Sequence, residues 1–230
     1  MKYKNLFFDL DDTIWAFSDN ACDTFEEMYY KYGLDAFFNS FEHFYSLYQK
    51  RNTELWIEYG NGLIKKEELN RQRFLYPLRA VGVDDSALAN AYSEDFFAVI
   101  PTKTRLMPHA REVLDYLVSN YNLYILSNGF RELQYRKMCS SGIDGYFKKI
   151  ILSEDIGLHK PAPQLFHFAL SATQSELSES LMIGDSWEAD IVGAKGVGMH
   201  QAFYNLSGRD EFSFTPTYHL KDLKELMEIL

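Results

Sequence analysis

The chain has 230 residues and a formal net charge of −10, from 33 acidic and 23 basic side chains. This length supports one large or two small domains, and 47% hydrophobic with 24% charged residues is typical of a folded globular protein. The acidic balance argues against binding nucleic acid polymers or anionic membranes, because both need a basic surface. No apolar run approaches the roughly 18 residues of a membrane span, and Met1–Phe8 is too short for a signal peptide. We therefore expect a cytoplasmic protein with no membrane or nucleic acid partner.

Two cysteines, Cys22 and Cys139, are too few for a disulfide scaffold. We interpret both as reduced, buried thiols, in keeping with a cytoplasmic location.

The first predicted element is the apolar run Tyr3–Phe8, which fits a buried strand and leads into the acidic segment Asp9–Thr13. From about residue 16 to 100 the hydrophobic period becomes that of helices. A capping box of Asn39 and Glu42 precedes the second of these stripes. The stripes run through Phe25, Met28, Tyr29 and Tyr32, then Phe37, Phe41, Phe44 and Tyr48, and then Leu88, Tyr92, Phe96 and Val99.

After Pro101 and Pro108 short strands alternate with helices. Such alternation predicts an α/β fold, an open parallel sheet with helices on both faces. We therefore predict a core of residues 1–15 and 103–230, with a helical domain of residues 16–102 inserted after the first strand. The later strands are predicted at residues 123–126, 149–152, 181–183 and 201–204, with a helix beginning near Asp190 and a last helix over residues 223–230.

Polar side chains collect where the predicted strands end, which is where open parallel sheets bind their ligands. Taken singly, each is better explained by a turn, a helix cap or a solvated lysine. Together they bring several carboxylates to one place, where these would repel one another unless a cation lay between them. Oxygen ligands favour a hard divalent ion, which we expect to be Mg²⁺. The residues are Asp9 and Asp11 after the first strand, Ser127 and Asn128 after the second, Lys160 after the third, and Asp185 after the fourth.

These residues belong to four motifs whose order resembles that of the haloacid dehalogenase superfamily. The resemblance covers the whole predicted core, and it implies a Rossmann-like sheet with an inserted helical cap. The longer strings at residues 127–134, 153–157 and 181–186 are most similar to the bacterial pyrimidine 5′-nucleotidase branch. The four motifs are Asp9-x-Asp11-x-Thr13, Ser127-Asn128-Gly129, Lys160-Pro161, and Gly184-Asp185-Ser186-x-x-x-Asp190.

The resemblance also implies the chemical roles of the two acids in the first motif. Asp9 would be the nucleophile that attacks phosphorus and forms an aspartyl-phosphate. Asp11 would protonate the leaving oxygen and then deprotonate the attacking water. True dehalogenases lack an acid at the position of Asp11, so its presence favours phosphoryl chemistry. Asp12 is expected to be a loop or cap residue.

The remaining motif residues are assigned to the metal, the phosphate and their support. Mg²⁺ would be held by Asp9, Asp185 and the backbone carbonyl of Asp11. Ser127 and Lys160, with Asn128 beside them, would bind the phosphoryl oxygens. Asp190 would support Lys160 or the metal's waters, and Thr13 and Gly129 would shape the loops.

The sequence therefore predicts a Mg²⁺-dependent phosphatase for a small phosphate monoester, first a nucleoside 5′-monophosphate and within that class a pyrimidine nucleotide. The alternatives are a sugar-phosphate or phosphoglycolate phosphatase, a phosphomutase, and a non-catalytic module that senses a phosphorylated metabolite or binds a partner. Most aromatic side chains of the helical block are expected to be core. The candidates to stack on a nucleobase are Phe17, Tyr45, Trp56 and Tyr59.

Overall fold

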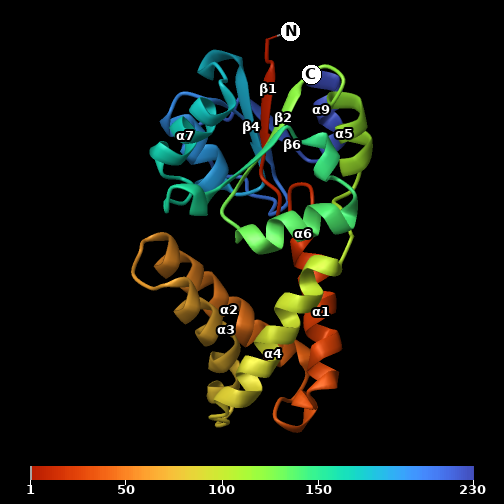
Figure 1. The fold of residues 1–230 in the computed structure, drawn as a ribbon, viewed down its shortest axis with the longest axis vertical. Coiled ribbons are helices and arrows are strands. Elements are labelled where there is room, and N and C mark those ends of the chain that lie inside the picture. The colour runs from red at the N-terminus through yellow and green to blue at the C-terminus, as the bar shows by residue number, and fades with distance from the viewer. Residues whose placement is uncertain (1) are drawn as a thin grey trace. The chain divides into compact units, whose positions relative to one another are not determined.

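The computed structural model describes residues 2–230 (Figure 1). Six parallel strands form one sheet in the order β3-β2-β1-β4-β5-β6, which confirms the predicted α/β class. The strands are β1 (Asn5–Phe8), β2 (Asn122–Ser127), β3 (Lys149–Leu152), β4 (Ser180–Gly184), β5 (His200–Tyr204) and β6 (Tyr218–Leu220).

Strand β1 lies at the centre of the sheet, and all four of its residues are buried. Its register aligns Asn5 with Asn122 of β2 on one side and with Ser180 of β4 on the other. A near-continuous apolar run is what a strand covered on both faces requires. The register brings the carboxyl ends of β1, β2 and β4 to the same edge of the sheet.

Helices cover both faces of the sheet (Figure 1). On one face, α7 (Pro163–Thr173) and α8 (Gly193–Gly196) pack Phe166 and Ala194 against Phe7 of β1 and Met182 of β4. On the other face lie α5 (Ala110–Leu117) and α9 (Leu226–Ile229), which contact each other. The α/β unit also contains α6 (Arg131–Ser141), which begins four residues after β2 ends.

Two compact units make up the chain, one of Met1–Ser18 with Thr104–Leu230 and one of Asp19–Lys103. The second unit is helical and is built from most of α1 (Phe17–Lys31) together with α2 (Phe41–Gly60), α3 (Lys66–Ala80) and α4 (Ser86–Val99).

Aromatic rings fill the interior of the helical unit. Phe25 is at the centre of this core, with ring centroids 4.1 Å from Tyr48 and 4.5 Å from Phe96. Tyr92 donates its hydroxyl to the Phe25 carbonyl at 3.0 Å, so that its polar end is satisfied inside an apolar core. The predicted stripes are therefore mainly core, with the exception of Phe37, which precedes α2 and is exposed.

Several local predictions were wrong. The N-cap of α2 is Ser40, whose hydroxyl accepts from the His43 N–H, and not Asn39. The helix after Asp185 begins at Trp187, and not near Asp190, as a π-helix over Trp187–Val192 that continues into α8.

The two cysteines were predicted to be buried, reduced thiols. Both are free thiols, but Cys22 is half-buried and Cys139 is exposed. Strand β6 was not predicted. Among residues 2–230, no helix is both long enough and apolar enough to span a bilayer.

Candidate active site

Asp9 follows the central strand directly and is anchored at its carboxyl edge. Its backbone N–H donates to the Ile183 carbonyl of β4 at 2.9 Å, and its side chain is nearly buried. The pKa of Asp9 is raised to about 7, first by burial and then by the charges of Asp190 and Asp11, against the lowering effect of Lys160. A carboxyl group in this position has lost most of its water and is available for chemistry.

Lys160 is a buried cation surrounded by oxygen acceptors. Its ammonium donates to Asp9 Oδ1 at 2.6 Å, to Asp190 Oδ1 at 2.6 Å and to the Leu126 carbonyl at 2.7 Å. An ammonium group has three N–H donors, so all three are used. Burial lowers the pKa of Lys160, but the charges of Asp190 and Asp9 outweigh burial and raise it above its ordinary value.

Asn128 holds the backbone of Lys160 in place. Its Oδ1 accepts from the Lys160 N–H at 2.8 Å, and its Nδ2 donates to the Lys160 carbonyl at 3.0 Å. This pair of bonds fixes the loop after β3 against the end of β2. The contact of Asn128 with phosphate stays a prediction. The second hydrogen of Nδ2 is available to make it.

Two hydrogen bonds join Asp185, which follows β4, to Thr13 of the first motif. The Thr13 hydroxyl donates to Asp185 Oδ1 at 2.9 Å and accepts from the Asp185 N–H at 3.1 Å. Burial raises the pKa of Asp185 to about 8, helped by the charges of Asp9 and Asp190 and opposed by the bond from Thr13.

Asp190 is fully buried beneath these groups and is held by two donors. One oxygen accepts from Lys160, and the other accepts from the Ser186 N–H at 3.1 Å. Gly184 leaves the room for it, because a Cβ at that position would lie 2.2 Å from Asp190 Oδ2. Asp190 therefore contacts Lys160, and its predicted supporting role, for Lys160 or for the metal's waters, stays a prediction.

Three carboxylates, those of Asp9, Asp185 and Asp190, offer oxygens within 4.8 Å of one another. Such hard oxygen donors suit Mg²⁺. Burial first, and then the charges of neighbouring carboxylates, raise the pKa values of Asp9 and Asp185, and a divalent cation would stabilise both groups in their charged forms. Both oxygens of Asp190 already accept protein hydrogen bonds, so Asp9 and Asp185 are the better ligands. The residues present therefore fit the predicted ion.

Asp11 has two partners on α6 that the sequence analysis did not identify. Gln134 Nε2 donates to Asp11 Oδ2 at 2.8 Å, and the Lys137 ammonium donates to Oδ1 at 2.7 Å. The indication in the sequence is the buried face of α6, where residues 134, 137, 138 and 141 recur at helical spacing although three of the four are polar. Polar residues on a buried helical stripe need partners, and here one partner is Asp11.

Gly129 lies against the side chain of Gln134. A Cβ at this position would lie 2.2 Å from Gln134 Nε2, so the glycine makes room for the Gln134 side chain. Asp12 has the expected cap role, since its carboxylate accepts from the N–H and hydroxyl of Ser18 in the first turn of α1.

The aromatic candidates for base stacking contact other side chains within their own units. The ring of Phe17 lies 5.0 Å from the Lys137 ammonium. Tyr45 is stacked on Phe41, and Trp56 packs edge-on against Tyr59. Trp187, beside the fourth motif, packs against Phe203, Phe212 and Phe214.

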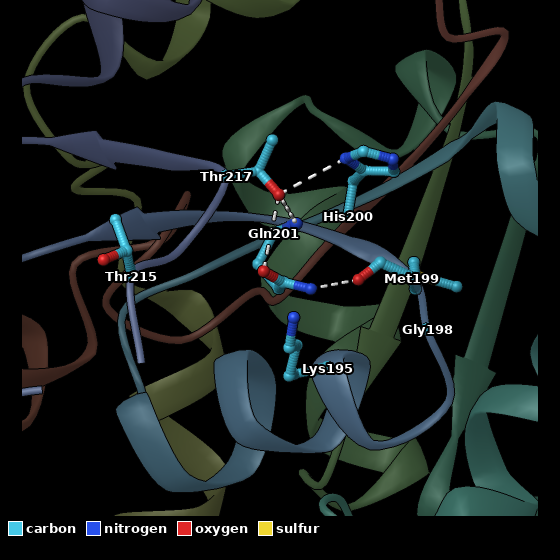
Figure 2. Close-up of a pocket in the computed structure, with 7 residues that line it drawn as sticks. All are labelled: Lys195, Gly198, Met199, His200, Gln201, Thr215 and Thr217. Atoms are coloured by element: carbon cyan, nitrogen blue, oxygen red, sulfur yellow. Dashed lines mark hydrogen bonds between the residues drawn. The ribbon is translucent and has the colours of Figure 1, made fainter. Parts of the chain in front are cut away.

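A separate pocket of about 240 Å³ lies at the opposite edge of the sheet, where β5 begins (Figure 2). Lys195 and Thr217 line it together with His200 and Gln201, and Thr217 contacts both of the latter. No carboxylate is among the described residues that line this pocket, so its chemistry differs from that of the acidic cluster.

Asp9 directly follows the central strand of the parallel sheet and is paired with Lys160, and a second acidic loop carries Asp185 and Asp190. This combination of fold and site is typical of one superfamily of hydrolases. Residues 3–198 match the haloacid dehalogenase-like hydrolase family, and the chain belongs to that family. This confirms the resemblance predicted from the four motifs.

Relatives with assigned names cover nearly the whole chain. It is similar to the pyrimidine 5′-nucleotidase YjjG of Escherichia coli, with 29% identity over 100% of this chain and 99% of the relative. It is also similar to a glyceraldehyde 3-phosphate phosphatase of Pyrococcus abyssi, with 34% identity over 87% and 81%. Among solved structures, the magnesium-bound HAD-hydrolase YfnB of Bacillus subtilis has a TM-score of 0.88 and 26% identity, over 100% of this chain and 99% of that one.

Proposed function

We propose that the protein is a Mg²⁺-dependent phosphatase that hydrolyses a small phosphate monoester through an aspartyl-phosphate on Asp9. The observation that carries this proposal is the buried pair of Asp9 and Lys160, 2.6 Å apart, at the end of the central strand. A carboxylate nucleophile beside a fixed cation suits attack on an anionic phosphoryl group.

In the first step, the Asp9 carboxylate attacks phosphorus and the bond from phosphorus to the leaving oxygen breaks. The Ser127 hydroxyl donates to a phosphoryl oxygen, and the positive charge of Lys160, 2.6 Å from Asp9, stabilises the phosphoryl oxygens as they gain charge. Asp11 gives a proton to the leaving oxygen, which departs as the alcohol. Bound Mg²⁺, held by Asp9, Asp185 and the Asp11 carbonyl, would screen the phosphate charge from the nucleophile.

In the second step, water attacks the phosphorus of the aspartyl-phosphate. Asp11 takes the proton of that water, and the bond between phosphorus and Asp9 breaks to release inorganic phosphate. Both oxygens of Asp11 accept hydrogen bonds, from Gln134 and Lys137, and these bonds hold the carboxyl group in place for both steps.

We infer that the substrate is a nucleoside 5′-monophosphate with a pyrimidine base. The similarity to YjjG over essentially both full lengths supports this choice. The similarity to a glyceraldehyde 3-phosphate phosphatase favours a sugar-phosphate substrate as the second candidate. A non-catalytic sensing role is disfavoured, because sensing needs neither the nucleophile Asp9 nor Asp11.

The test begins with release of phosphate from 4-nitrophenyl phosphate in the presence of Mg²⁺, by the wild-type protein and by Asp9→Asn. We expect turnover by the wild type and none by the variant. Pyrimidine and purine nucleotides, sugar phosphates and phosphoglycolate are then ranked by kcat/KM. Hydrolysis of none of these esters, or full activity of Asp9→Asn, would overturn the proposal.

A further inference from the structure

The side-chain amide of Gln134 joins two groups of the candidate site. Its Nε2 donates to Asp11 Oδ2 and to Ser127 Oγ, each at 2.8 Å. Gln134 is fully buried, and its Oε1 has no hydrogen-bond partner among residues 2–230. Turning the amide over would place Oε1 against the Asp11 carboxylate, which repels it, so the observed orientation is the favourable one.

The Ser127 hydroxyl has a fixed direction because of these contacts. Its oxygen accepts from Gln134 and also from the Gly129 N–H at 3.1 Å. A hydroxyl has two acceptor sites and one donor hydrogen, so both acceptor sites are filled. No residue that the structure describes accepts the hydrogen of Ser127. That hydrogen is left to donate to an incoming anion.

Asp11 is held at both of its oxygens by one helix. Gln134 binds Oδ2, and Lys137, one turn further along α6, binds Oδ1 at 2.7 Å. The Lys137 ammonium also lies 4.7 Å from the ring of Trp15 and 5.0 Å from that of Phe17, and its side chain is buried. Rotation of the Asp11 carboxylate would therefore break a half-buried ion pair and a hydrogen bond together.

We propose that Gln134 is a positioning residue for phosphoryl transfer, which sets the direction of the Ser127 hydroxyl and, with Lys137, the place of the Asp11 carboxylate. This inference rests on the proposed phosphatase function. The identity of the group matters, because both contacts need a neutral donor of two hydrogens. Glutamate has the same shape, but it would repel Asp11 and would accept the Ser127 hydrogen.

The test compares Gln134→Met and Gln134→Glu with the wild-type enzyme. Rates are measured with 4-nitrophenyl phosphate and with an alkyl ester, uridine 5′-monophosphate or glycerol 2-phosphate, whichever the wild type hydrolyses faster. A nitrophenolate leaves without protonation and an alkoxide does not. The value of kcat/KM, which reports the first chemical step, therefore depends on proton transfer from Asp11 only for the alkyl ester. The inhibition constant of inorganic phosphate measures the contact with Ser127. The matched control is Gln174→Met, at an exposed position just after α7.

We expect Gln134→Met to lower the ratio of alkyl to aryl kcat/KM by about tenfold, and to weaken inhibition by phosphate by about tenfold. Gln134→Glu should change both in the same direction and by more. The ratio does not depend on the fraction of folded enzyme, so a merely structural role would leave it unchanged. If Gln134→Met does not fold, the same ratio and inhibition constant are measured with the isosteric variant Gln134→Glu.

A ratio and an inhibition constant that both stay within about twofold of the wild type would overturn the inference. In that case the proposed function stands, provided that the wild type hydrolyses 4-nitrophenyl phosphate and Asp9→Asn does not. Failure of the wild type to hydrolyse any ester would instead contradict the proposed function itself.

Discussion

Gly184→Ala should destabilise the protein although it adds only one methyl group. The new Cβ would lie 2.2 Å from Asp190 Oδ2 and 2.4 Å from its Cγ. The carboxylate would have to retreat by about 1 Å or more to reach normal contact. It is held by Lys160 at 2.6 Å and by the Ser186 N–H at 3.1 Å, so this movement breaks both bonds.

The expected magnitude follows from the burial of the ion pair. The side chains of Lys160 and Asp190 are 2% and 1% exposed, so solvent screening does not weaken the pair. Breaking a buried pair costs about 3–5 kcal/mol. For a chain of this size, this corresponds to a fall in Tm of about 6–20 °C.

Thermal unfolding of the variant in two backgrounds tests the cause of this loss. In Asp190→Ala the obstructing carboxylate is absent, so adding Gly184→Ala should cost about 1 kcal/mol or less. The matched control is Gly196→Ala, whose Cβ would meet no atom within 4 Å, and which should be neutral or slightly stabilising. An equal cost of Gly184→Ala in both backgrounds, or a fall in Tm of only about 2 °C, would refute the argument.

Three further predictions concern the metal, the acid and pH. EDTA should abolish phosphatase activity and Mg²⁺ should restore it; full turnover by rigorously metal-free protein would contradict the proposed metal site. Asp11→Asn should slow an alkyl ester by about 10²–10⁴ and 4-nitrophenyl phosphate by less, and equal losses in single-turnover rates would contradict its role. The folded-state pKa values of Asp9 (about 7) and Asp185 (about 8) exceed the ordinary 3.8. Their neutral forms therefore stabilise the metal-free protein fully below about pH 4, and that stability is lost progressively as the pH rises from about 4 to between 7 and 8. Its Tm, measured in EDTA, should fall over that range and fall less in Asp185→Asn; an unchanged slope in the variant would contradict these pKa values.

The arrangement of the strands was predictable because its determinants are local. Apolar runs alternate with helical periods, and right-handed crossovers bring the carboxyl ends of parallel strands to one edge. Strand β6 was missed because Tyr218–Leu220 has only three residues, too few for a period to be visible. The N-cap of α2 was displaced by one residue, since Asn39 and Ser40 are both good caps and only the backbone geometry distinguishes them.

The candidate site was only partly predictable for a different reason. Asp9, Lys160 and Asp185 follow strands, so the fold itself brings them together. Gln134 and Lys137 lie within a helix, where polar residues are usually exposed, and their partner Asp11 is 123 and 126 positions away in the sequence. Their burial depends on how α6 packs on the core, which no local pattern determines. The same holds for Gly129, whose neighbour is the Gln134 side chain.

The chain leaves the α/β unit and returns to it at a single point. Trp15 pairs with Leu106 in an antiparallel bridge, the Ala16 N–H donates to the Arg105 carbonyl at 3.1 Å, and the Met107 N–H donates to the Ile14 carbonyl at 2.9 Å. An insertion whose two ends are already fastened side by side adds little loop-closure entropy to the host, whatever its length. Recombination can therefore exchange or enlarge the inserted segment while the sheet and its chemistry are inherited intact. For protein engineers, the paired segments at residues 14–16 and 105–107 are the natural junction for grafting the helical segment of one relative onto another.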